Sequence, residues 1–387
     1  MNDIHPLLDE ESQKKARLYE KEKRLFGFAS LILSLAFLLF FYFSGVSSSL
    51  ADLNIAHSII GTILVYVVAF YSAMTILGLP LDFVSGYVHE HKWGFSNHTV
   101  KSWLWDKIKS FLIGLIIFFL ILGLLLWIMA LIPEWWWLAA ATAMAVVSVF
   151  FAIIFPVVIA PVFNKYTPIH NEDLTRALDK ILVREGLKNS GIFKEDMSRQ
   201  TKKENAFLAG LGKTRRIVLG DNLLENMTIG EIESIIAHEV GHYKYQHIWK
   251  NIGIGTLQQL LIFFVIHWIL IRTFPDFLTS TQDNLSLFPV FAILLGGFSG
   301  FLFAPLNHFL SRYFERQADR YALSNLEHNR SFITALAGLA NRNLSNAYPE
   351  WWVKLLYYSH PPIGERLEMA EKKAKTKEES VLKTPDG

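Results

Sequence analysis

The chain has 387 residues, of which 52% are hydrophobic and 14% aromatic, and its formal net charge at pH 7 is +2. This composition is far more apolar than that of an ordinary soluble domain and is typical of a membrane protein. The absence of cysteine excludes disulfide and thiolate sites, and the small net charge gives no indication of nucleic-acid binding.

Six uncharged stretches are long enough to cross the hydrocarbon layer of a bilayer, which needs roughly 20 helical residues. They are Leu25–Ala51, Ser58–Leu81, Phe111–Pro133, Trp135–Asn164, Asn251–Ile271 and Asn284–Ser311. The sequence therefore predicts an all-α polytopic membrane protein with about six transmembrane helices. Trp135, Trp136 and Trp137 are expected at the outer interface, where tryptophan is enriched.

Lysine and arginine lie almost entirely in segments that six spans place on one side of the bilayer. By the positive-inside rule that side is cytoplasmic. The prediction is a cytoplasmic segment at 1–24, four transmembrane helices at 25–164 with a cytoplasmic loop at 82–110, a cytoplasmic catalytic region at 165–250, two transmembrane helices at 251–311, and a cytoplasmic region at 312–387.

The polar region between the fourth and fifth spans begins with a helical pattern. In EDLTRALDKILVREGL, residues 172–187, leucine and isoleucine recur at intervals of three and four. Two short apolar runs follow, Ala206–Leu211 and Ile217–Leu219, and Gly212–Thr214 between them is a plausible turn. This pattern predicts a short β-hairpin.

A second helix is predicted to begin at Thr228. Thr228 and Glu231 fit a capping box, in which the two side chains satisfy free amide groups at a helix start. Isoleucines at 229, 232, 235 and 236 give this helix one apolar face.

The same helix carries HEVGH at residues 238–242. His238 and His242, four residues apart, project from one face and can bind one metal ion. Glu239 points about 100° away from His238, where its carboxylate can accept a proton from water. The pattern is short enough to arise by chance, so histidines satisfied by hydrogen bonds are the alternative. On a continuing helix His247 faces elsewhere, and a third ligand has to come from another element.

A candidate third ligand lies in LSRYFERQADRYALSN, residues 310–325, which directly continues the sixth span. Glu315 and Asp319 lie four residues apart on one helix face. Glu315 would complete the metal site, and Asp319 would hydrogen-bond a ligating histidine and fix its tautomer. The alternative is a surface ladder of ion pairs with Arg316 and Arg320.

A third candidate segment is YYSHPPIGERLEMA, residues 357–370. His360 precedes two prolines, which hold the backbone extended before a helix that starts near Ile363. Arg366 falls in the first turns of that helix. Together His360 and Arg366 could stabilise an oxyanion; the alternative is an ordinary helix-start loop.

These motifs resemble the integral-membrane CAAX prenyl endopeptidases, which are zinc enzymes with a glutamate as third ligand. The resemblance extends from about Lys15 to Glu368 and rests on GLPLDFVSGYVHEHKWGFSNHT, IAPVFNKYTPI, NAFLAGLGKTRRIVL, HEVGHYKYQH, FERQAD and SHPPIGERL, in family order. It implies a ring of long helices around a large water-filled chamber, with the catalytic site at its cytoplasmic end.

Carried over to this chain, the resemblance implies one Zn²⁺ held by His238, His242 and Glu315, with Glu239 as general base. It also implies that Asn205 contacts the substrate backbone and that His360 and Arg366 contact the substrate and the transition state. A peptide would add as a strand along the edge that starts at Asn205, Ala206 and Phe207.

The sequence thus predicts a membrane-embedded zinc endopeptidase that cleaves near the C-terminus of a peptide or protein substrate, prenylated and of CAAX type. One alternative is a quality-control protease without prenyl specificity; another is a transporter or scaffold with a structural metal site of four protein ligands. The architecture of six predicted spans and the absence of cysteine indicate a bacterial relative located in the inner membrane. If the protein is eukaryotic, its location would be the membrane of the endoplasmic reticulum. The oligomeric state stays open.

Overall fold

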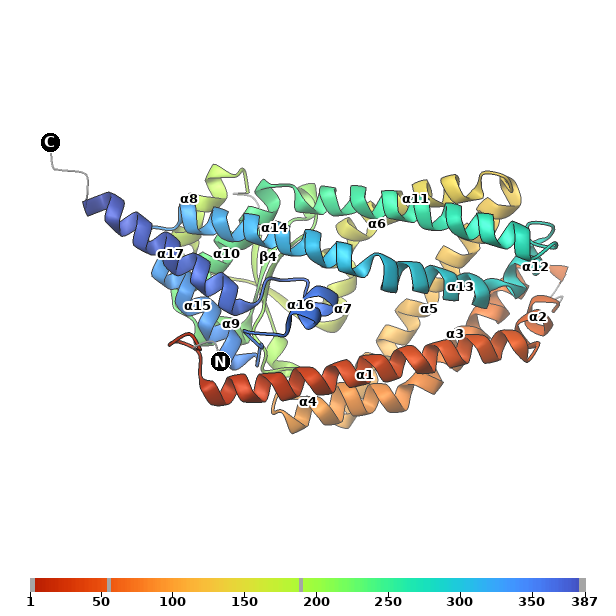
Figure 1. Ribbon diagram of the computed structural model, residues 1–387, viewed down its shortest axis with the longest axis horizontal. Helices are drawn as coiled ribbons and strands as arrows, with labels where there is room; N and C mark the ends of the chain where they lie inside the picture. The colour runs from red at the N-terminus through yellow and green to blue at the C-terminus, as the bar shows by residue number, and fades with distance from the viewer. Residues whose placement is uncertain (1–3, 54–56, 188–190, 383–387) are drawn as a thin grey trace.

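The computed structural model describes residues 4–53, 57–187 and 191–382. Long helices run side by side along the long axis of the molecule, and the shorter helices and the sheet gather at the end where both termini lie (Figure 1). The helices of the long bundle are α1 (Glu10–Phe43), α3 (Ile59–Phe83), α5 (Val100–Leu131), α6 (Trp136–Ile154), α11 (His247–Thr273), α13 (Phe288–Gly297) and α14 (Ala304–Asn325). Short helices α2 (Val46–Ala51) and α12 (Thr281–Ser286) lie at the opposite end.

Five helical stretches in the described residues are long and apolar enough to cross a membrane, and a bent pair makes a sixth if it counts as one span. The pair is Phe288–Leu302 with Ala304–Asn325, and the bend is 48°. Pro305 is the second residue of α14 and explains the break, because proline has no N–H to bond the carbonyl four residues earlier and its ring clashes with that carbonyl. The prediction of about six transmembrane helices is confirmed, with the bent pair counted as the sixth span.

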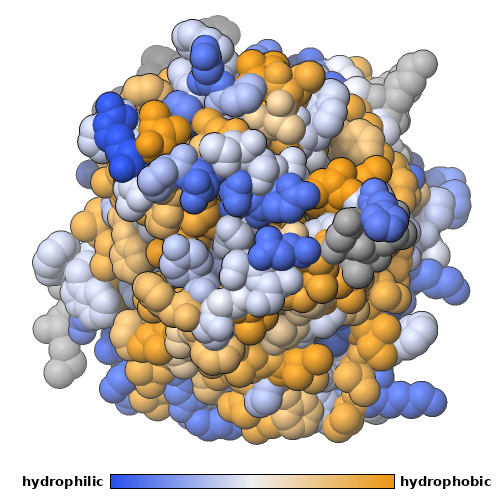
Figure 2. Space-filling view, turned by 90° about the vertical axis from the view of Figure 1, so that its right-hand side faces the viewer, coloured by the Kyte–Doolittle hydropathy of each residue, from blue (hydrophilic) through white to orange (hydrophobic). Residues whose placement is uncertain are grey.

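The helices extend beyond the predicted apolar stretches. Helix α1 begins at Glu10, well before Leu25, and the Asp9 side chain caps it by accepting a hydrogen bond from Ser12 N at 2.7 Å. Helix α3 continues without a sharp bend to α4 (His89–Lys92). At the far end of the bundle, hydrophilic and hydrophobic side chains both reach the surface (Figure 2).

The predicted tryptophan belt is wrong for Trp136. Trp135 is 57% exposed, but Trp136 is fully buried, and its indole Nε1–H donates a hydrogen bond to His267 Nδ1 at 2.9 Å. Helix α6 begins at Trp136 and packs along α11, so the first turn of α6 faces the bundle. The same bond gives His267, which is partly buried, a polar partner between α6 and α11.

The remaining elements form the end of the molecule that carries both termini. The sheet consists of β1 (Tyr166–Pro168), β2 (Gly191–Glu195), β3 (Ala206–Ala209) and β4 (Arg216–Gly220). The helices are α7 (Ala160–Phe163), α8 (Glu172–Arg184), α9 (Asp221–Asn226), α10 (Ile229–Lys244), α15 (Asn329–Arg342), α16 (Trp351–Tyr357) and α17 (Ile363–Leu382).

The predicted hairpin is present as β3 and β4, which pair antiparallel with Ala206 opposite Leu219. The sheet order is β1-β2-β4-β3, so β3 is an edge strand. The sequence pattern predicts neither β1 nor β2, and it places the end of β3 at Leu211. The strand ends earlier because Gly210 has φ +90°, where an added Cβ would lie 2.3 Å from Thr214 O.

The two predicted helices of this region are confirmed. Helix α8 buries its four predicted apolar residues, Leu174, Leu178, Ile181 and Leu182. Helix α10 starts with the predicted capping box: Thr228 N donates to Glu231 Oε2 at 2.9 Å, and Glu231 N donates to Thr228 Oγ1 at 3.3 Å. Ile232 and Ile236 are buried in the core that α8 also enters, while Ile229 is exposed. The cap thus sets which side chains of α10 face inward.

Candidate metal centre

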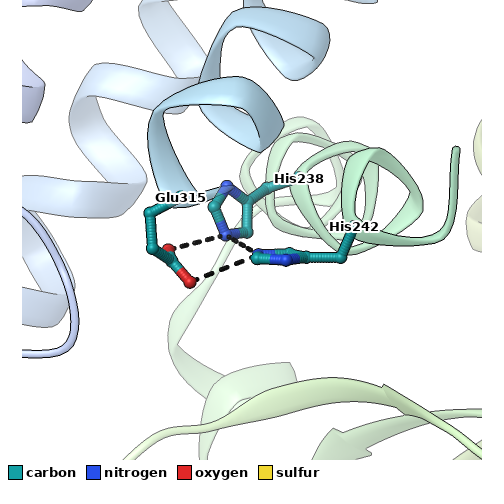
Figure 3. A group of neighbouring side chains, drawn as sticks. All are labelled: His238, His242 and Glu315. Carbon is teal, nitrogen blue, oxygen red and sulfur yellow. Dashed lines mark hydrogen bonds and ion pairs between the residues drawn. The ribbon is translucent and has the colours of Figure 1, made fainter. Parts of the chain in front are cut away.

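Helices α10 and α14 bring together the three side chains expected to hold a metal (Figure 3). His238 Nε2 and His242 Nε2 lie 3.1 Å apart. The Glu315 carboxylate faces both rings, with Oε2 3.3 Å from His238 Nε2 and Oε1 3.3 Å from His242 Nε2. The expected convergence of two imidazoles from one helix and a carboxylate from a distant helix is therefore observed.

This donor set fits a small divalent cation. Four ligands placed tetrahedrally at zinc distances of about 2.0–2.1 Å lie about 3.3 Å from one another. The observed separations of 3.1–3.3 Å match that value. In addition, Glu315 Oε2 is buried, and its contact with His238 Nε2 at 3.3 Å does not have hydrogen-bond geometry. A buried carboxylate oxygen of this kind requires a partner, which a cation would provide.

The group of potential ligands within the described residues contains three side chains, whose ligand atoms all lie within 4.8 Å of one another. Structural zinc sites usually have four protein ligands, whereas catalytic sites have three and keep a position for water or substrate. Three ligands at the wall of a cavity therefore favour a catalytic site over a structural one.

Asp319 supports the site from behind His238, as the sequence predicts. Asp319 Oδ1 lies 2.8 Å from His238 Nδ1, and the Asp319 side chain is fully buried. Burial alone would lower the pKa of His238, but the neighbouring carboxylates of Asp319 and Glu315 outweigh it and raise the pKa to about 10. The Asp319 bond fixes the proton on Nδ1 and leaves Nε2 directed at the metal position.

Arg366 lies behind Asp319, and its expected contact with the transition state stays a prediction. Its Nε and Nη2 atoms donate to the two Asp319 oxygens at 2.9 and 2.6 Å. Burial opposes the charge on Arg366, yet Asp319 more than offsets this and raises the Arg366 pKa further. The guanidinium is thus held by the residue that orients His238.

His247 is a site residue that the sequence analysis misses. Its Nδ1 lies 2.9 Å from His242 Nδ1, and its Nε2 lies 3.0 Å from Gln317 Oε1. Helix α10 ends at Lys244, and the left-handed turn at Gln246 (φ +55°) redirects the next residue toward the site. When His242 binds a metal through Nε2, its Nδ1–H donates to His247 Nδ1, and His247 Nε2–H donates to Gln317.

A cavity of about 700 Å³ adjoins the three ligands. Glu239 and His360 line it, together with the expected substrate-contacting residues Asn205, Ala206 and Phe207. The Asn205 carbonyl accepts a hydrogen bond from Gly220 N at 3.0 Å, while its side chain is exposed to the cavity. His360 Nε2 lies 3.3 Å from Glu315 Oε1. Arg366 does not line this cavity.

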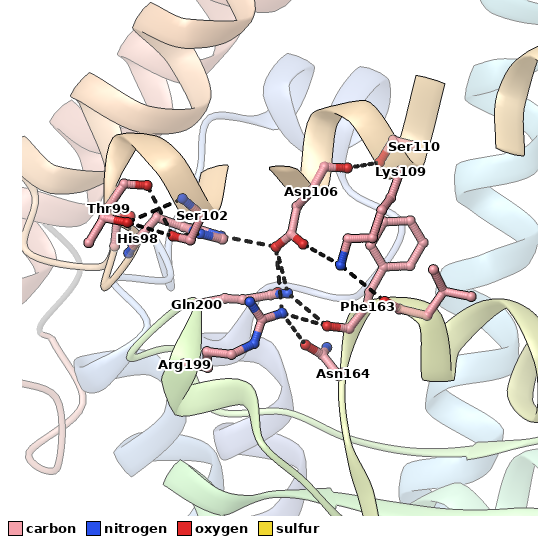
Figure 4. A network of polar contacts seen from close by, with 12 residues as sticks. His98, Thr99, Ser102, Asp106, Lys109, Ser110, Phe163, Asn164, Arg199 and Gln200 are labelled. Carbon is pink, nitrogen blue, oxygen red and sulfur yellow. Dashed lines mark hydrogen bonds and ion pairs between the residues drawn. The ribbon is translucent and has the colours of Figure 1, made fainter. Parts of the chain in front are cut away.

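Polar networks hold the segment that leads into β3. Asp106 of α5 lies 3.5 Å from Arg199 Nη2 and accepts a hydrogen bond from Gln200 Nε2 at 3.2 Å (Figure 4). A few residues later Lys203 donates to Glu90 Oε2 at 2.7 Å. The end of the second span and the start of the third thereby hold the segment that leads into β3.

The approach of α10 to α14 depends on Gly241. A Cβ added there would lie 2.9 Å from Ala318 Cα and 3.1 Å from Ala318 O, which are backbone atoms that cannot rotate away. Gly241 lies between Glu239 and His242, and Ala318 lies between Glu315 and Asp319. Two small residues thus set the distance at which the imidazoles meet the carboxylate.

Comparison with known proteins agrees with this geometry. The family described as CAAX prenyl protease N-terminal, five membrane helices, matches residues 2–165, and peptidase family M48 matches residues 168–374. CAAX prenyl protease 1 of Saccharomyces cerevisiae is 31% identical, covering 93% of this chain and 86% of that protein. An uncharacterized metalloprotease of Bacillus subtilis, YhfN, is 30% identical, covering 77% and 70%.

The crystal structure of S. mikatae Ste24p superposes with a TM-score of 0.82 at 30% identity, covering 95% of this chain and 91% of that one. The chain belongs to the CAAX prenyl protease family of M48 peptidases. The resemblance inferred from the six motifs is therefore confirmed. As a member of this family, the protein is a multi-pass membrane metalloendopeptidase that acts on peptide or protein substrates.

Substituting Gly241→Ala should weaken metal binding by forcing α10 away from α14. Overpacking of this kind typically costs about 1–3 kcal/mol of stability. We expect a lower affinity for zinc in competition with a chelator, and a lower unfolding temperature. Gly253→Ala is the control, because a Cβ at Gly253 would have no atom within 4 Å. Equal zinc affinities of the two variants would refute this role of Gly241.

Proposed function

We propose that the protein is a zinc endopeptidase that hydrolyses a peptide bond near the C-terminus of its substrate, with Glu239 as general base. One observation carries the proposal: His238, His242 and Glu315 face the same cavity as Glu239 and the edge strand β3. Hydrolysis needs these three parts: a position for a metal, a general base, and a strand edge with which the substrate backbone can pair.

His238, His242 and Glu315 would hold a zinc ion, which would supply polarisation of the scissile carbonyl and a lowering of the pKa of water toward about 7. Glu239 accepts a proton from the attacking water while the oxygen of that water adds to the carbonyl carbon. The carbon–nitrogen bond then breaks, and Glu239 delivers the proton to the leaving amine. Asp319 and His247 hold the two imidazoles in the tautomers that direct Nε2 toward the metal position.

The substrate backbone is proposed to pair with β3 as an added strand. Edge pairing fixes the register of a peptide without reading its side chains closely. Asn205 would donate a hydrogen bond to the substrate backbone, and His360 would contact the carbonyl oxygen as negative charge develops on it. We propose that the cavity is the cytoplasmic end of the water-filled chamber.

Substituting Glu239→Gln should remove hydrolysis and leave zinc bound, because glutamine keeps the shape of glutamate but accepts no proton. A general base typically contributes about 100- to 10,000-fold to the rate. The measurements are peptide turnover and zinc content of the purified protein. Glu233→Gln, on the same helix but outside the cavity, is the control. Full turnover by the Glu239 variant would remove Glu239 from the role of base.

For Arg366 we propose a positioning role, in place of direct contact with the transition state. Arg366 makes two hydrogen bonds to Asp319, and Asp319 in turn holds His238. Lysine cannot make the same forked pair.

Arg366→Lys is therefore expected to lower zinc affinity about 10- to 100-fold, as losses of this kind behind metal ligands do. Zinc titration against a chelator measures this, alongside kcat at saturating zinc. Arg320→Lys, at an exposed position of α14, is the matched control. If kcat falls while zinc affinity is unchanged, Arg366 acts on the substrate instead.

We propose prenylated CAAX-type C-termini as substrates, since the yeast relative is named a CAAX prenyl protease. The catalytic end would face the cytoplasm, which the distribution of lysine and arginine supports. The match to a Bacillus subtilis metalloprotease supports the bacterial inner membrane as the location. Quality-control proteolysis without prenyl specificity is a second candidate, favoured by the polar residues Asn251, Thr256 and Gln259 in the wall of the cavity.

A farnesylated C-terminal peptide and its unlipidated twin separate these two candidates. We expect kcat/KM to be at least about tenfold higher for the farnesylated peptide, a difference of ~1.4 kcal/mol in transition-state binding. Mass spectrometry of the products identifies the cleaved bond. Equal values of kcat/KM for both peptides would favour the quality-control candidate.

A further inference from the structure

Helix α16, Trp351–Tyr357, exposes an unusual amount of apolar surface for a short helix outside the spans. Five of its seven residues are large, apolar or aromatic, and exposed: Trp351 (77%), Tyr357 (53%), Leu356 (43%), Trp352 (39%) and Leu355 (39%). Tyr357 lines a cavity of about 870 Å³ that also reaches Arg24 and His360. We call the other four residues the α16 face. Contiguous exposed surface of this kind marks a binding surface.

The contacts of α16 fix its depth relative to the spans. The Arg24 guanidinium lies 5.8 Å from the centre of the Trp352 ring, and Arg24 is the last charged residue of α1 before the uncharged stretch that starts at Leu25. On the other side Arg312 Nη1 donates to Lys354 O at 2.8 Å and to Tyr358 O at 2.6 Å. Arg312 is the first charged residue of α14 after the uncharged stretch of the sixth span.

Helix α16 therefore lies between α1 and α14 at the level where both change from apolar to charged (Figure 1). In a membrane protein this level is the boundary between hydrocarbon and water. Tryptophan and tyrosine are enriched there because their rings are apolar at one end and hydrogen-bonding at the other. Short segments with tryptophan and leucine on one face bind in the plane of this boundary.

We propose that α16 is an interfacial anchor whose face, as defined above, is embedded among the lipid headgroups of the bilayer. The anchor is connected to the catalytic site in two ways. Arg312, which holds the end of α16, precedes Glu315 by three residues on α14, and His360 follows α16 by three residues. Lys354 also pairs with Glu365 at the start of α17. Lipid contact thus holds the loop that presents His360.

The absence of cysteine from the chain permits a direct test with single-cysteine variants. Trp351→Cys, carrying a fluorescent label, is reconstituted into vesicles of phosphatidylcholine and phosphatidylglycerol. Arg176→Cys, at a 75% exposed side chain of α8, is the aqueous reference. Phe40→Cys, 65% exposed near the end of the first span, is the lipid reference. Quenching is measured with aqueous iodide and with phosphatidylcholine brominated near the start of its acyl chains.

We expect the label at 351 to resist iodide several-fold better than the label at 176 and to be quenched by the brominated lipid. Iodide quenching equal to that at 176 would overturn the proposal, because the face would then lie in water. Protection from iodide without quenching by lipid would also overturn it, because protein would then cover the face. Neither measurement depends on proteolytic activity, so the result is independent of the proposed function.

Discussion

The close packing of α10 against α14 is the constraint on which the site depends. Gly241 and Ala318 let the two backbones approach each other closely. The charged residues Glu315 and Asp319 lie on either side of Ala318 along α14. Two carboxylates, Glu315 and Asp319, are buried at this contact. Burying an unpaired charge costs much more free energy than a hydrophobic contact returns, so each carboxylate requires a partner.

The two carboxylates meet this requirement differently. Asp319 is fully satisfied, because Arg366 and His238 both bond to it. Glu315 keeps one buried oxygen without a hydrogen bond. A metal ion would provide the missing partner of Glu315, and metal binding would then be coupled to the stability of the α10–α14 contact. The hydrogen bonds of Asp319 need no metal, whereas the Glu315 carboxylate would gain a partner from the ion.

The parts of this arrangement that depend on local signals are predictable from the sequence. The capping box at Thr228 fixes where α10 begins, and the four-residue spacing then places His238 and His242 on one face. The same spacing places Glu315 and Asp319 together on α14. Which partner each side chain meets depends on how three helices pack, and spacing within one helix does not contain that information.

The errors in prediction share this cause. His247 is placed away from the site if α10 continues, but the helix ends and the turn at Gln246 reverses that conclusion. Trp136 has the composition of an interfacial residue, yet its position in the first turn of α6 buries it against α11. Strands β1 and β2 are short, and they form because β1 pairs with β2 and β2 pairs with β4.

The position of Glu315 along α14 has a consequence for what can be cleaved. Arg312 marks the boundary of the uncharged stretch, and Glu315 follows it by three residues, a rise of about 4.5 Å along a helix. Under the proposed function, hydrolysis would take place close to the level at which α14 changes from apolar to charged residues. A substrate tail anchored in the bilayer by a lipid would already lie at that level, whereas a folded soluble protein would first have to release a tail. The position of Glu315 on α14 would then select substrates by their height above the bilayer, before any recognition of their sequence.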